Sequence, residues 1–196
     1  VGAGSYALTA RATDNLGAVS TSAVVNITVN VAGQSPYGGT PWAVPGQIQA
    51  ENYDVGGEGI AYHDNDTANQ GGQYRTDGVD IKTTADSGGG YAVGWLNANE
   101  WLEYTVNVAA GGNYNIQARV GTTFTNRTFR IEFNGVDKTG AVAVPNTGGF
   151  QTYQNLSQTV NLSAGVQVMR IFFNGNDANF NYFTLTAVGA TNTPTN

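Results

Sequence analysis

Cysteine is absent from the 196-residue sequence, which excludes disulfide bonds, thiolate zinc sites and cysteine nucleophiles. Charged residues are also scarce, at 11% of the chain, and 14 acidic residues stand against 8 Lys and Arg. Nucleic-acid binding requires cations that neutralise phosphates, and attachment to anionic membrane surfaces requires the same cations. The formal net charge of −6 therefore disfavours nucleic acid and membranes as partners.

Long hydrophobic runs are missing as well, since no run approaches the roughly 20 residues that span a bilayer. Short apolar stretches alternate with turns, which the 27 glycines help to form, and no convincing amphipathic helix interrupts them. This pattern predicts an all-β fold, a β-sandwich of the jelly-roll kind, with an extra N-terminal β-hairpin. The expected strands cover residues 6–12, 24–31, 48–53, 79–83, 90–95, 100–108, 112–120, 128–133, 151–160, 166–173 and 180–186.

Composition also predicts where the chain divides. Residues 1–31 hold two predicted strands around a turn, and they resemble the last two strands of an immunoglobulin-like or cadherin-like spacer domain; the alternative is a hairpin packed on the main domain. Residues 32–46 hold three of the five prolines and are expected to be a linker. Residues 47–188 form the expected main domain, and 189–196 a second linker. Because Val1 is not a natural start, we expect any export signal to lie upstream.

Six phrases follow one another along the main domain: GGGYAVGWLNANEWLEYTVNV, GNYNIQARV, FRIEFNGV, VPNTGGFQTYQ, LSAGVQVMRIFF and NFNYFTLT. Together with the earlier IQAENYD, they resemble the family 6 carbohydrate-binding modules. These are jelly-roll modules appended to polysaccharide-degrading enzymes. The resemblance implies that residues 47–188 are a carbohydrate-binding module.

In this family one sugar site lies in loops at the edge of the sandwich. By resemblance its residues are Trp95 after the Val-Gly pair, Phe150 after the Gly-Gly of VPNTGG, and Asn179 in the closing N-x-N phrase. The C–H face of a pyranose packs on aromatic rings, and amides bond its hydroxyls. Phe150 departs from the family's usual Trp, so we expect weaker stacking or a main site elsewhere. We assign Trp101 and Tyr153 to the core.

A long, polar, Gly-rich insertion covers residues 58–75, and long loops on rigid scaffolds often carry recognition. We count Glu58, Tyr74 and, outside the insertion, Asn97 as further candidate sugar-binding residues. The family sometimes uses a second site on its concave face, and the candidates for it are Tyr62, His63, Tyr74 and Arg75. The alternative is a solvated loop held by local side-chain bonds.

The family also holds a structural Ca²⁺ between its first and last strands, an ion that prefers carboxylate, amide and carbonyl oxygens. The resemblance implies donors from Gln49 and Glu51 at one end of the module and from Asn181 at the other. Gln49 and Asn181 stand where acidic residues are common, which lowers the expected affinity. Calcium is the cofactor that we expect.

An enzyme is the rival class, chiefly a glycosidase that needs two carboxylates across a cleft. Glu100 and Glu103 would lie on opposite faces of a strand, because their separation is odd. The single histidine, His63, has no identifiable triad partners. We therefore expect no catalysis.

The function that these features predict is targeting of a linked glycoside hydrolase to its polysaccharide. The insertion favours agar-type galactans or β-glucans over xylan as the ligand. We expect a secreted, monomeric module joined to other domains of the same polypeptide. A structural or adhesive β-sandwich spacer is the alternative, and such a spacer has no need to keep Trp95 and Phe150 open to solvent.

Overall fold

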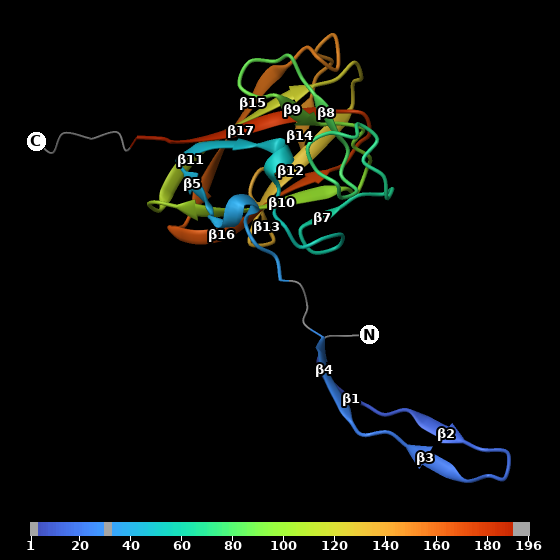
Figure 1. Ribbon diagram of the computed structural model, residues 1–196. Coiled ribbons are helices and arrows are strands. Elements are labelled where there is room, and N and C mark those ends of the chain that lie inside the picture. The colour runs from blue at the N-terminus through green and yellow to red at the C-terminus, as the bar shows by residue number, and fades with distance from the viewer. Residues whose placement is uncertain (1–3, 30–32, 190–196) are drawn as a thin grey trace, which may run out of the picture. The chain divides into compact units, whose positions relative to one another are not determined.

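The computed structural model describes residues 4–29 and 33–189. The chain forms two compact units, which divide between Gly33 and Gln34 (Figure 1). Each unit is built from β-strands. The helical segments among the described residues are short 3₁₀ turns, and no helix there is long and apolar enough to cross a membrane.

The N-terminal unit contains two antiparallel strand pairs: β1 (Gly4–Leu8) with β4 (Val25–Val29), and β2 (Arg11–Thr13) with β3 (Val19–Thr21). The expected strand over residues 6–12 is thus two strands, interrupted where the amide of Ala10 donates to Ser22 Oγ at 2.9 Å. Every side chain from residue 7 to residue 27 is exposed. A two-stranded ribbon without a buried face is marginally stable by itself.

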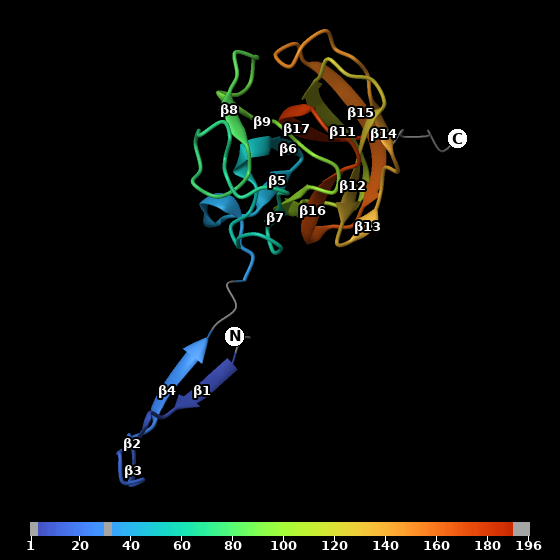
Figure 2. The same cartoon turned by 90° about the vertical axis from the view of Figure 1, so that its right-hand side faces the viewer.

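The larger unit is a sandwich of two sheets that pack face to face (Figure 1, Figure 2). The six-stranded sheet has the order β15-β11-β17-β9-β8, with β6 paired to β17. Its strands are β6 (Gly46–Gln49), β8 (Ile81–Thr83), β9 (Tyr91–Val93), β11 (Gly112–Gly121), β15 (Gln154–Leu162) and β17 (Asn179–Ala187).

The seven-stranded sheet has the order β13-β12-β16-β10-β5, with β14 paired to β12 and β7 paired to β10. Its strands are β5 (Trp42–Val44), β7 (Tyr62–His63), β10 (Trp101–Val108), β12 (Arg127–Phe133), β13 (Val136–Asp137), β14 (Val142–Val144) and β16 (Gly165–Phe173). β5 runs parallel to β10, whereas the other pairs in this unit are antiparallel.

The core forms between the sheets because alternate residues of each strand point to the same face. On β10 these residues are Leu102, Tyr104, Val106 and Val108, each at most 2% exposed. Residues of β16, from the same sheet, and of β17, from the facing sheet, belong to the same hydrophobic cluster. The period-two alternation in the sequence therefore predicted the fold class correctly: the main unit is an all-β sandwich.

Residues 32–46, which the sequence predicts as a linker, contain the 3₁₀ turn η1 (Tyr37–Gly39) and β5. Val44 is 1% exposed and packs in the core, so the compact unit includes β5. The expected strand over 48–53 ends instead at Gln49, where the 3₁₀ turn η2 (Ala50–Asn52) begins. Residue 189 apart, the expected second linker lies outside the described residues.

Candidate functional site

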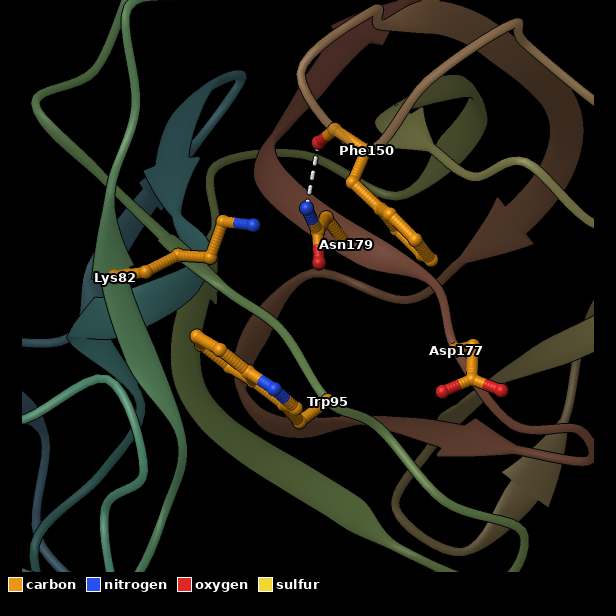
Figure 3. Close-up of a pocket in the computed structure, with 5 residues that line it drawn as sticks. All are labelled: Lys82, Trp95, Phe150, Asp177 and Asn179. Atoms are coloured by element: carbon orange, nitrogen blue, oxygen red, sulfur yellow. Dashed lines mark hydrogen bonds between the residues drawn. The ribbon is translucent and has the colours of Figure 1, made fainter.

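A pocket of about 200 Å³ opens at the end of the six-stranded sheet, where β9 meets the start of β17. It is lined by Lys82 of β8, Trp95 after β9, Phe150 before β15, Asp177, and Asn179 of β17. Figure 3 shows the rings of Trp95 and Phe150 on opposite sides, with Asn179 between them. The structure thus brings together three candidate sugar-binding residues that are far apart in the sequence.

The loop that follows β9 presents the Trp95 ring to solvent, with 41% of the residue exposed. Its backbone is left-handed (φ 50°), a conformation that a bulky residue adopts only where surrounding contacts hold it. Asn97 supplies one such contact, because its Nδ2 donates to the Trp95 carbonyl at 3.1 Å. The next residue, Leu96, is 2% exposed and anchors the loop in the core. These contacts therefore fix the backbone from which the ring projects.

The opposite wall, Phe150, is tied to Asn179 through the backbone. Asn179 Nδ2 donates to the Phe150 carbonyl at 2.6 Å, and its Oδ1 is left facing the pocket (Figure 3). Thr147 holds the same loop, because its Oγ1 donates to the Thr122 carbonyl at 2.9 Å. Asn179 thus fixes the backbone that carries the Phe150 ring and leaves Oδ1 as an acceptor in the pocket.

Lys82 and Asp177 line the same pocket, and sequence reasoning missed both. Lys82 Nζ lies 5.2 Å from the Trp95 ring centroid and 5.9 Å from that of Phe150. Burial lowers the pKa of its amine. The one signal in the sequence was strand alternation, which points Lys82 to the face opposite the buried Ile81. Asp177 belongs to the NGND loop before β17, where only the packed structure shows its place.

The other three candidate sugar-binding residues lie outside this pocket. Asn97 donates to the Trp95 carbonyl and to the carboxylate of Glu100, and it is not among the residues that line the pocket. Tyr74 packs on Tyr91 with centroids 4.8 Å apart. Glu58 bonds to the ring nitrogen of His63 and accepts from the amide of residue 64. Their polar character did not distinguish loop-holding residues from pocket-lining ones.

The residues considered for a second site are also engaged in structural contacts. Tyr62 is 6% exposed, and Arg75 lies 3.6 Å from the ring centroid of Tyr53 while pairing with Asp77 at 2.8 Å. His63 is half-buried, and its ring centroid lies 6.4 Å from that of Trp101. The insertion is thus bonded to the sandwich at several points.

The assignment of Trp101 to the core is wrong. Leu102 and Tyr104 point inward, so their neighbour Trp101 lies on the outer face of the seven-stranded sheet, where it is half-buried. The guanidinium of Arg170 lies 4.3 Å from its ring centroid. Tyr153, in contrast, is buried at 7% exposure.

Glu100 and Glu103, the carboxylates considered for catalysis, both hold the structure together. Glu100 accepts from the amides of Asn97 at 2.7 Å and Asn65 at 3.1 Å, and so joins two loops. Glu103 pairs with Arg170 at 2.6 Å. Neither carboxylate is among the residues that line the pocket.

The three candidate calcium donors share an unusual property. Among the described residues, Gln49 Oε1, Glu51 Oε2 and Asn181 Oδ1 are buried and have no hydrogen-bond partner. Burial of the carboxyl group raises the pKa of Glu51 to about 7. Buried polar atoms are nearly always paired, so these three orphaned oxygens are donors that could hold a cation.

The amide groups of this set are oriented by their nitrogens. Gln49 Nε2 donates to the Gly88 carbonyl at 2.6 Å, and Asn181 Nδ2 donates to Asp86 at 2.8 Å. Both oxygens therefore face Gly89, where a Cβ would overlap Asn181 Oδ1 and lie 2.7 Å from Gln49 Oε1. The absence of a side chain at residue 89 leaves room for an ion, and the oxygen donors suit Ca²⁺.

Three neighbouring carboxylates, Asp66, Asp80 and Glu100, are distinct from the candidate calcium donors. Asp80 is 2% exposed and accepts from the amide of Gln70 at 2.6 Å, which ties the insertion to β8. Burial, followed by the nearby charges of Asp66 and Glu100, raises the pKa of Asp80 to about 6. Its charged form is thus unfavourable in the folded protein.

Asp80→Asn is therefore expected to become more stabilising as the pH rises. The pKa of Asp80 is about 6 when folded, against 3.8 as its ordinary value, so wild type loses stability between about pH 4 and 6. Asparagine keeps the acceptor but never ionises. The free energy of unfolding of the variant, relative to that of wild type, should rise on the order of 2 kcal/mol between pH 4 and pH 8. Urea unfolding at each pH measures this difference. Asp137→Asn removes an exposed carboxylate and is the control; an equal gain there would contradict the assignment.

Comparison with known proteins places the chain in a family. The family model described as carbohydrate binding module (family 6) matches residues 70–187, more than half of the chain. The α-agarase of Alteromonas agarilytica is 33% identical over 150 residues, which is 72% of this chain and 10% of the agarase. The chain spans only 10% to 22% of the length of the curated relatives that it matches.

Solved structures agree with this match. The family 6 module of lichenase 5A from Cellvibrio mixtus, in complex with cellotriose, is 30% identical with a TM-score of 0.58 and covers 74% of this chain and 99% of that module. A β-1,3-glucan-binding family 6 module from Bacillus halodurans is 25% identical, again with a TM-score of 0.58, and covers 76% of this chain and 100% of that module. By sequence match, by its two-sheet sandwich and by these structural neighbours, the chain belongs to the family 6 carbohydrate-binding modules, which are non-catalytic.

Proposed function

We propose that the pocket between Trp95 and Phe150 binds one sugar ring of a polysaccharide. The observation that carries this proposal is the pair of rings on opposite sides of one pocket, with Asn179 Oδ1 between them (Figure 3). The rings pack on the C–H faces of the sugar, and the amide accepts from a hydroxyl group. A soluble domain gains nothing from an exposed, strained Trp unless a ligand covers it.

The ligand that we propose is an agar-type galactan or a β-glucan rather than xylan. The α-agarase at 33% identity supports the galactan, and the modules named for cellotriose and β-1,3-glucan support the glucan. A xylanase A from Thermoclostridium stercorarium is 28% identical, so relatives are also found among xylan-degrading enzymes. Binding to a panel of polysaccharides decides between these ligands.

The module would keep a linked, secreted glycoside hydrolase close to its substrate. A pocket of about 200 Å³ contacts a single ring, so its affinity is expected to be modest. Tethering raises the effective concentration of the enzyme at the polymer even when each contact is weak. The exposed apolar side chains of the N-terminal unit, such as Val25 at 59% and Leu16 at 88%, fit strands of an adjoining spacer domain.

Calcium is the metal that we propose for Gln49, Glu51 and Asn181. Their orphaned oxygens support it, and so does the lack of a side chain at Gly89, beside the oxygens of Gln49 and Asn181. Among the described residues, no three carboxylate, imidazole or thiolate groups come together as a metal site. The candidate set consists instead of one carboxylate and two amides, which suits a hard cation held at modest affinity. The ion would join η2 to β17 and stabilise the fold.

The proposed function is tested with the full chain and a carbohydrate panel. Agarose, laminarin, barley β-glucan and xylan are set in affinity gels, and their soluble oligosaccharides are titrated against tryptophan fluorescence. Retardation by galactan or β-glucan, with a change in emission, supports the proposal. No retardation and no spectral change with any sugar would leave the structural spacer as the better explanation, and release of reducing ends would indicate an enzyme.

Phe150→Trp is expected to strengthen sugar binding about three-fold. A larger ring covers more of the sugar face, and its indole N–H adds a donor at the rim. Phe150→Ala should weaken binding roughly ten-fold by removing one wall. Isothermal titration with the best oligosaccharide measures both, and Phe124→Ala is the control because Phe124 packs on Phe150 at 6.1 Å outside the pocket lining. Equal affinity in all four proteins would show that the sugar does not contact this wall.

A further inference from the structure

We propose that the pocket selects a sugar residue that carries an acidic substituent, a carboxylate or a sulfate ester, and that Lys82 is its partner. This inference rests on the proposed function of the pocket and specifies the class of sugar that it takes. It departs from a ligand made only of neutral sugars. The evidence is the position of Lys82, its lack of a protein counter-ion, and the space that admits it.

Lys82 differs from the arginines of the same unit. Each of those five lies within 4.0 Å of a carboxylate: Arg75, Arg119, Arg127, Arg130 and Arg170. Among the described residues, no carboxylate lies that close to Lys82 Nζ, although Lys82 is half-buried. A cation on the folded surface is usually paired or fully hydrated, so this one is held ready for an external anion.

The side chain of Lys82 reaches into the pocket rather than out to solvent. Figure 3 shows its amine on the same side of the pocket as Asn179, above the Trp95 ring. Gly94 makes this possible, because a Cβ there would lie 3.3 Å from Lys82 Cδ and 2.7 Å from Asn179 Oδ1. The amine thus lies beside the space that a sugar between the two rings would occupy.

The desolvation of Lys82 determines which ligand the pocket prefers. A sugar that enters displaces water from the amine, and loss of hydration is costly for a charge without a counter-ion. Hydroxyl groups of a neutral sugar replace that water with uncharged acceptors. A carboxylate or sulfate forms a charge-assisted hydrogen bond, which is about twice as strong. The acidic sugar therefore offsets the desolvation cost of the amine, which a neutral sugar leaves uncompensated.

Asp177 sets the orientation of the bound sugar. Figure 3 shows it across the pocket from Lys82, and its carboxylate lies 4.0 Å from the guanidinium of Arg127. Arg127 offsets part of this negative charge, and the remaining carboxylate accepts from sugar hydroxyls. An acidic substituent would point towards Lys82, with hydroxyl groups towards Asp177.

The test is a set of sugars that share one ring and differ in a single substituent, neutral or acidic, titrated into the full chain by NMR. The probes are methyl β-galactoside, its sulfate ester at the primary hydroxyl, and the corresponding uronic acid, with the matching glucosides. Wild type is expected to bind an acidic sugar roughly ten-fold more tightly than its neutral parent. The sulfate and the uronic acid together show which anion fits.

Variants of Lys82 decide whether that residue causes the selectivity. Lys82→Met keeps an apolar stem against Trp95 and should bring acidic and neutral sugars to equal affinity, whereas Lys82→Arg should keep the preference. Lys138→Met removes the other lysine of the chain, which is exposed, and should change nothing. Thermal melting confirms that each variant is folded.

Three outcomes would overturn this inference. Neutral sugars that bind wild type as tightly as acidic ones, through Trp95, would refute it while leaving the proposed function standing. A preference for acidic sugars that persists in Lys82→Met would assign the selectivity to another residue. Absence of binding by every probe, neutral or acidic, would instead refute the proposed function of the pocket and this inference with it.

Discussion

Replacement of Trp95 by alanine is expected to abolish detectable sugar binding while leaving the module folded. The ring forms one wall of the pocket and is 41% exposed, so its loss removes ligand contact rather than core packing. If the sugar covers roughly 100 Å² of apolar surface, about 25 cal/mol per Å² corresponds to about 2.5 kcal/mol, or roughly 70-fold in affinity. Because a single-ring pocket starts from modest affinity, such a loss exceeds what titration can follow. Affinity gels and calorimetry provide the measurement.

Trp101→Ala is the matched control for this experiment. Trp101 is half-buried on the outer face of the seven-stranded sheet, away from the residues that line the pocket. Binding should survive in this variant and disappear in Trp95→Ala. The reverse result would move the ligand to the sheet face. Retained binding in both variants would contradict the proposed role of Trp95.

Calcium is expected to raise the melting temperature of the module, and Glu51→Gln is expected to remove that effect. An ion that binds only the folded state stabilises that state by about 2.7 kcal/mol when its free concentration is about 100 times its Kd. In a unit of this size that corresponds to roughly 5–10 °C in melting temperature. Differential scanning calorimetry in excess calcium and then in chelator measures the shift.

Wild type should be more stable than Glu51→Gln in calcium, and this order should reverse when calcium is removed. Glu51 is 4% exposed and has an unpaired oxygen, so its ionised form is costly without a cation. In chelator at pH 8, Glu51→Gln should therefore be at least as stable as wild type, and in calcium less stable. Glu58→Gln removes the same charge from an exposed side chain and should respond to calcium as wild type does. A melting temperature indifferent to calcium in all three proteins would refute the metal assignment.

The strand pattern was predictable because it depends on local chemistry. Alternating residues of a strand point to opposite faces, so the sequence WLEYTVNV alone predicts which residues of β10 point inward. The same rule places Trp101, next to the inward Leu102, on the outer face, so the assignment of Trp101 to the core departed from it. Proline content misled over residues 32–46, where three prolines predict an extended linker, whereas Val44 packs in the core.

The candidate site was predictable only in part. Trp95, Phe150 and Asn179 were named from short motifs, and packing brings them to one pocket. Glu58 and Tyr74 were named from the polarity of their loop, and that polarity serves hydrogen bonds and ring contacts that hold the loop to the sandwich. Local composition cannot distinguish a loop that binds a ligand from a loop that binds its own protein.

The sequence by itself determined the all-β class, which follows from local alternation, and the family, which follows from short motifs in their order along the chain. The same motifs named Trp95 and Phe150 as an aromatic pair. Only the tertiary structure decided that Lys82 and Asp177 share the pocket with that pair, and that Gln49 and Asn181 turn their amide oxygens towards Gly89. The physical reason is that charge and hydrogen-bonding capacity acquire a role from their surroundings. Lys82 reaches the pocket because β8 pairs with β9 and because Gly94 leaves room for its side chain.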